Sequence, residues 1–143
     1  MYVSKKNVKE SGQSLVELAL SLIFLAILLG VVVDGGLAFF NWITLRDAAQ
    51  EGAIYAAMNP TDVAVTGTRA RASSTDPILQ DANINVSYIG SACRGITSGV
   101  ANGVTVEVTY FYTFITPFFR PAGWAGVNIR ASATNTILNP PCP

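Results

Sequence analysis

Histidine is absent from this chain of 143 residues, and charged side chains are scarce. Charged residues make up 13% of the sequence, whereas a typical soluble domain has about 25%. Nine basic and nine acidic residues give a formal net charge of zero, which argues against a nucleic-acid-binding protein that depends on excess positive charge. Half of the residues are hydrophobic. This composition indicates a protein associated with a membrane rather than a free cytosolic protein.

The sequence lacks most of the residues and motifs that enzymes use for catalysis. The missing histidine removes the commonest general base and metal ligand, and the 2 cysteines cannot form a structural zinc site alone. The sequence has no glycine-rich phosphate-binding loop and no metal-ligand spacing. Glu17 and Asp34 would lie about 25 Å apart on one helix, which is too far for a catalytic carboxylate pair. We therefore expect no enzymatic activity, no metal site and no bound cofactor.

One long apolar run accounts for part of the charge deficit. Residues 18–33 read LALSLIFLAILLGVVV and contain no charged side chain. As a helix this run is about 24 Å long, and apolar residues continue after Asp34, so we expect a membrane span over about residues 18–40. All lysines lie at positions 5–9, before the run. By the positive-inside rule they place the amino terminus in the cytoplasm and the rest of the chain outside it.

A cleaved secretory signal peptide is the alternative interpretation of this segment. It needs a basic start, an apolar run and small residues after that run, and Gly35-Gly36 or Ala38 would satisfy the last requirement. Glu17 argues against it, because an acid at the start of the apolar run makes membrane insertion costly and has no use in a signal peptide.

The residues at the start of the run resemble the class III signal of type IV pilins and pseudopilins. The resemblance is carried by the lysines and by Gly12-Gln13-Ser14-Leu15-Val16-Glu17, followed by the apolar helix. It implies that prepilin peptidase cuts after Gly12, on the cytoplasmic side, and leaves Gln13 as the new amino terminus. It also implies that Glu17 meets the terminal ammonium of a neighbouring subunit, since a carboxylate in hydrocarbon needs a cationic partner. In the alternative, Glu17 lies at headgroup level, where the helix dipole favours an acid.

A longer stretch is similar to the TadE-like family of small pseudopilins associated with tight-adherence (Tad) pili. The residues that carry this similarity are Gly12, Glu17, Asp34 and the segment Asp47–Ala57. The similarity is specific over residues 12–57 and looser over 103–138. Gln50 and Ile54 stand where members of the family often have arginine. The resemblance implies that Glu17 and Asp34 take part in assembly or in contacts between subunits.

The rest of the chain predicts an α+β fold. After a basic leader at residues 1–12, residues 13–58 contain no proline and predict one long helix that continues beyond the membrane. Alternating apolar and polar residues predict strands at 83–88, 104–114 and 127–134. We expect residues 59–143 to form an extracytoplasmic domain, with a three- or four-stranded antiparallel sheet packed on the extension of the helix.

Three large aromatic side chains lie in the connection that follows the second predicted strand. They are Phe118, Phe119 and Trp124, in a segment bounded by prolines and a glycine. If exposed, such a loop indicates a partner or a membrane surface. The alternative is that the rings fold back under the sheet.

Cys93 and Cys142 both fall in the outer domain, where oxidising conditions allow a disulfide. Type IV pilins often hold their carboxy-terminal region in this way, so the resemblance favours a bridge, and two free thiols are the alternative. A bridge would contribute about 3–4 kcal/mol in the chain-entropy treatment.

Two functions fit these features. In the first, the protein is a pilin-like structural subunit of a Tad or type IV-like pilus, cleaved by prepilin peptidase and assembled through its helix with similar subunits for pilus assembly or surface adhesion. In the second, it is a single-pass accessory subunit of a larger integral membrane complex, with its leader uncleaved. Both make membrane lipid a partner, and neither involves nucleic acid. Both place the protein in the cell membrane, and the first also allows an extracellular filament.

Overall fold

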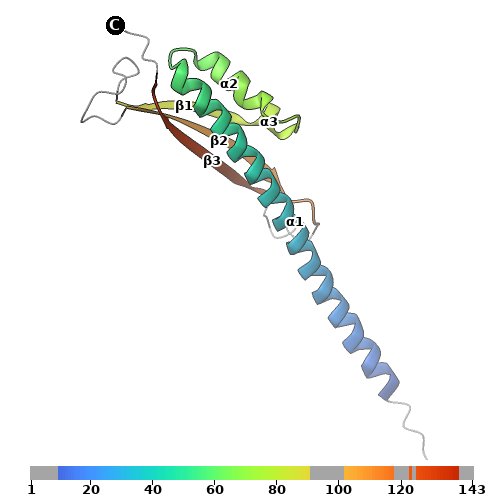
Figure 1. Cartoon of the computed structure of the whole chain (residues 1–143). Coiled ribbons are helices and arrows are strands. Elements are labelled where there is room, and N and C mark those ends of the chain that lie inside the picture. Colours follow the sequence, from blue (N-terminus) through green and yellow to red (C-terminus); the bar gives the residue numbers. More distant parts are fainter. Residues whose placement is uncertain (1–9, 91–101, 118–122, 124, 139–143) are drawn as a thin grey trace, which may run out of the picture.

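The computed structural model describes residues 10–90, 102–117, 123 and 125–138. In chain order its elements are α1 (Glu10–Met58), α2 (Val63–Ala72), α3 (Ile78–Asp81), β1 (Asn83–Ile89), β2 (Gly103–Thr113) and β3 (Gly126–Thr136). The first part of α1 projects from a small body, which we call the head, formed by α1 from Asp34 onward, α2, α3 and the sheet (Figure 1). The predicted α+β fold with a long amino-terminal helix is confirmed.

The sheet has three antiparallel strands in the order β1-β2-β3. Val106, in the middle of β2, pairs with Val86 of β1 and with Ala133 of β3. Because successive side chains of a strand point to opposite faces, Val104, Val106 and Val108 share one face, and all three are fully buried in the hydrophobic core with α1. The register therefore places the apolar residues of the sheet under the helix.

The other face of the sheet is polar. The hydroxyl oxygens of Thr105 and Thr134 lie 2.8 Å apart on this face. Arg130 lies 3.9 Å from Glu107 across the β2–β3 pair, in an exposed ion pair. The alternation expected from the sequence thus separates a core face from a polar face.

Small side chains let α1 lie close to the sheet. The buried residues of the packed part of α1 include Leu45, Ala48, Ala49, Ala53, Ala56 and Ala57. Gly52 lies at a close approach, because a Cβ atom there would lie 3.2 Å from both the Ala70 Cβ and the Val106 Cγ1. The helix therefore meets α2 and β2 at a position that has no room for a side chain.

α1 runs without a break through Gly35 and Gly36 over its full 49 residues. A Cβ atom at either glycine would meet nothing within 4 Å. At about 1.5 Å per residue the helix is about 73 Å long. One continuous element therefore forms both the projecting part of the molecule and part of the core.

Candidate functional site: the projecting helix and the Asp34 junction

The projecting part of α1 presents an apolar surface on all sides. Residues 12–33 are exposed, except for Gly30, and they extend away from the head (Figure 1). α1 contains a window with a mean hydropathy of 2.8 and is long and apolar enough to cross a membrane. At about 1.5 Å per residue, residues 12–33 are about 33 Å long, which matches a hydrocarbon core of about 30 Å. This segment fits a membrane anchor. The predicted span over about residues 18–40 stays a prediction, and residues 12–33 are the part of α1 that lies before the head.

The residues of the predicted cleavage site lie near the start of α1. Gly12 and Gln13 are both helical and exposed, and Glu17 follows one turn after Gln13. The backbone carbonyl of Glu17 accepts a hydrogen bond of 2.9 Å from the Ser21 hydroxyl. In the described part of the chain, no side chain pairs with the Glu17 carboxylate. The cleavage after Gly12 and the contact of Glu17 with another subunit stay predictions.

Asp34 lies where the projecting helix meets the head, and only 2% of it is exposed. Its Oδ1 accepts hydrogen bonds from the Tyr112 hydroxyl at 3.1 Å and from the Ile115 N–H at 3.0 Å. Its Oδ2 accepts one from the Thr116 N–H at 3.2 Å and another from the Thr116 hydroxyl. Hydrogen bonds to an ionised carboxylate are stronger than those between neutral groups. Asp34 therefore ties the segment after β2 to the helix, and we call these four residues the Asp34 junction.

Tyr112 is the buried donor of this junction. Burial raises the pKa of Tyr112 to about 12, and the hydrogen bond to Asp34 and the charge of that carboxylate act in the same direction. The hydroxyl consequently keeps its proton at neutral pH and serves as a donor. The ring also makes an edge contact with Phe114, with ring centres 5.9 Å apart.

The sequence singled out Asp34 but not its partners. Asp34 is the only charged residue between positions 18 and 45, which marks it as exceptional. Tyr112, Ile115 and Thr116 lie 78 to 82 positions later, and nothing local connects them with it. Asp34 was expected to contact another subunit; its hydrogen bonds in this structure are within the chain, and the contact between subunits stays a prediction.

Two other predicted features are the aromatic loop and the disulfide. The aromatic residues Phe118, Phe119 and Trp124 lie outside the described residues, and so do Cys93 and Cys142. The predicted partner loop and the predicted disulfide therefore stay predictions.

The chemistry of the described residues is that of a structural junction. Among them, no group of histidine, cysteine, aspartate or glutamate side chains could hold a metal ion. The carboxylate buried in the described part of the chain, that of Asp34, is fully engaged with donors of its own chain. The arrangement holds the head at a fixed place along an apolar helix.

Comparison with known families agrees with this description. The model of the family described as TadE-like protein matches residues 12–53. The match covers the projecting part of α1, Asp34 and most of the part of α1 that packs in the head, and it confirms the TadE-like resemblance over these residues; the looser resemblance over 103–138 lies outside the match. No curated protein and no solved structure matches this chain.

Proposed function

We propose, starting from the TadE-like character of residues 12–53, that this protein is a membrane-anchored structural subunit of a Tad pilus apparatus. The observation that carries the proposal is the exposed apolar surface of residues 12–33, which must be covered by lipid or by neighbouring helices. The lysines at positions 5–9 favour a cytoplasmic amino terminus and an extracytoplasmic head. The role is structural rather than catalytic.

In this proposal the subunit is processed and assembles as a pilin does. Cleavage after Gly12 creates an ammonium group on Gln13, one helical turn before Glu17. Two charges of opposite sign on neighbouring subunits neutralise each other in hydrocarbon, where either one alone is costly. The exposed position of Glu17 supports this pairing.

A second candidate is an accessory subunit that keeps its leader and stays in a larger membrane complex. One observation supports it: α1 begins at Glu10, so the helix already includes both Gly12 and Gln13. In this candidate the apolar surface packs against the helices of other membrane proteins and no filament is formed.

The amino-terminal mass of the protein taken from its native membrane or filament tests the proposal. We expect a chain that begins at Gln13, and Gly12→Val should block its formation. Gly35→Val is the matched control, because a Cβ atom at either glycine meets nothing within 4 Å. An intact leader in the working assembly would contradict pilin-type processing and favour the accessory subunit.

A further inference from the structure

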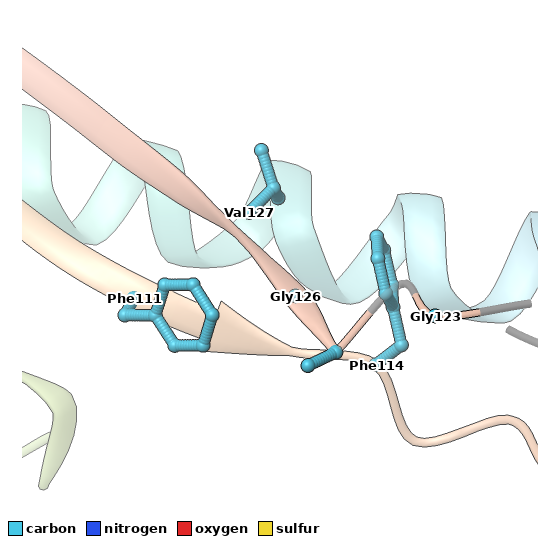
Figure 2. Close-up of a pocket in the computed structure, with 6 residues that line it drawn as sticks. Phe111, Phe114, Gly123, Gly126 and Val127 are labelled. Carbon is cyan, nitrogen blue, oxygen red and sulfur yellow. The ribbon is translucent and has the colours of Figure 1, made fainter. Parts of the chain in front are cut away.

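An apolar hollow lies at the end of the head nearest the projecting helix. It has a volume of about 550 Å³ and is lined by Phe111, Phe114, Gly123, Ala125, Gly126 and Val127 (Figure 2). None of these residues carries a charge. Phe111 is 49% exposed and Val127 is 45% exposed, and Ile115, which follows Phe114, is 67% exposed. The head therefore presents large apolar side chains to its surroundings at this end.

The register shows how this surface is built. Phe111 pairs with Asn128 on the polar face of the sheet, and Tyr112 pairs with Val127 on the face toward α1. The apolar surface thus wraps around both sides of the sheet where β3 begins. Gly126 brings the two strands together, because a Cβ atom there would collide with the Tyr112 carbonyl oxygen and would lie 3.0 Å from the Phe111 ring.

The Asp34 junction sets the position of this surface along the helix. The Asp34 carboxylate accepts hydrogen bonds from the backbone N–H groups of Ile115 and Thr116, so Ile115 lies level with position 34 of α1. Residues 12–33 have the length of a hydrocarbon core. When this segment spans a bilayer, Asp34 lies at the outer boundary, and Ile115 lies there with it.

We propose that Phe111, Phe114, Ile115 and Val127, here called the proximal patch, rest on the outer surface of the bilayer that holds α1. This inference rests on the proposed function, because it needs α1 to span the membrane. The occupant is lipid because the helix places the patch at the depth of the headgroups, where exposed Phe and aliphatic side chains of interfacial proteins insert into the boundary with the acyl chains. The head then contacts the bilayer as well as being anchored in it.

Two exposed aromatic residues of α1 lie close to this level. Phe39 and Phe40 lie about 8–9 Å beyond Asp34 along the axis, just outside a headgroup layer about 5–7 Å thick, and helical side chains lean toward the amino terminus and therefore toward that layer. Together with the proximal patch they give exposed apolar side chains on α1, on β2 and the segment after it, and on β3. A head that contacts lipid in this way has a fixed tilt, since its sheet end and its helix both lie at the membrane.

Photocrosslinking of the full chain tests this inference. Benzoylphenylalanine replaces Ile115 in the patch, and in separate proteins it replaces Leu22 in the projecting helix or Leu138 at the far end of the head. Leu138 is the matched control, because it is an aliphatic residue 62% exposed and its N–H donates to the Ala57 carbonyl, about 35 Å beyond Asp34 along the helix. Each protein is reconstituted in phosphatidylethanolamine–phosphatidylglycerol vesicles and irradiated, and adducts are identified by mass.

We expect lipid adducts at positions 22 and 115 and none at position 138. The same probe in place of Phe111 keeps an aromatic ring and should also label lipid, which guards against misfolding caused by the change at Ile115. Lipid adducts at 22 but at neither 115 nor 111 would overturn the inference and leave the membrane anchor standing. Adducts at 115 with protein, or lipid adducts at 138 equal to those at 115, would also overturn it. Absence of lipid adducts at position 22 would contradict both the proposed membrane anchor and this inference.

Discussion

The Tyr112 hydroxyl at the end of β2 donates a hydrogen bond of 3.1 Å to the Asp34 carboxylate of α1, across 78 positions of the sequence. Before Asp34 the helix is exposed, and after it the helix packs into the head. The bond therefore lies at the point where the surroundings of α1 change. The first two predictions concern this bond.

Asp34→Ala should destabilise the head more than the loss of an exposed acid does. The change leaves the Tyr112 hydroxyl and two backbone N–H groups without their acceptor. An unsatisfied buried donor costs about 1–3 kcal/mol, and among these donors only the Tyr112 hydroxyl is buried, so we expect the free energy of unfolding to fall by about 1–3 kcal/mol. Urea unfolding in detergent micelles measures it. Glu107→Ala is the control, since its exposed ion pair is worth at most about 1 kcal/mol. Equal losses in the two variants would show that the junction contributes little.

Alkaline titration should reveal the environment of Tyr112. Because the pKa in the folded protein is raised to about 12 from 10.0, the contribution of this group to stability is complete below pH 10 and is lost as the pH rises through 12. Tyrosinate absorbance measures the titration, and Tyr112→Phe should remove the highest step. In Asp34→Asn the pKa should fall but stay above its ordinary value, because burial is the largest cause of the shift. An unchanged titration curve in Tyr112→Phe would contradict this assignment.

Substitution by leucine should lower the stability of the protein at Gly52 and raise it at Gly36. Gly52→Leu forces a side chain against Ala70 and Val106 and should lower the free energy of unfolding by about 3 kcal/mol. Gly36→Leu has open space around it and should strengthen α1 by up to about 1 kcal/mol, because glycine is a poor helix former. Thermal unfolding of the two proteins in the same detergent compares them. A stable Gly52→Leu protein would mean that α1 and α2 separate easily.

Glu17→Ala should abolish incorporation into a pilus and leave membrane insertion intact. The reason is the loss of the acid that is proposed to meet the ammonium group of a neighbour. Quantifying the subunit in sheared filaments and in membranes separates the two effects. Glu51→Ala is the control, because it removes an exposed acid from the part of α1 that lies in the head. Normal incorporation of Glu17→Ala would instead place Glu17 at headgroup level.

Local patterns were sufficient to predict the long helix and the three strands. The absence of proline between positions 13 and 58 predicted one continuous helix, and α1 is continuous to Met58. The alternation at Val104, Val106 and Val108 predicted a strand with one buried face, and all three are buried. Helix continuity and strand alternation both depend on residues that are close together in the sequence, so they can be predicted without knowing the tertiary structure.

The Asp34 junction could not be predicted in the same way. Its donors come from the far end of β2, and their position depends on the register of the sheet against α1. The proximal patch was also missed, because Phe111 belongs to a regular strand and its exposure results from its place at the end of the sheet. Both features arise from packing at long sequence separation.

The unbroken course of α1 also fixes the azimuth of the head. Each residue of an α-helix advances about 100° around the axis, so the directions of Glu17 and Asp34 differ by about 260° once whole turns are removed. A single residue inserted between them would rotate the head by about 100° and move it outward by about 1.5 Å. If all subunits contact their neighbours through Glu17 in the same way, the polar face of the sheet has the same orientation relative to the axis of the assembly in every subunit.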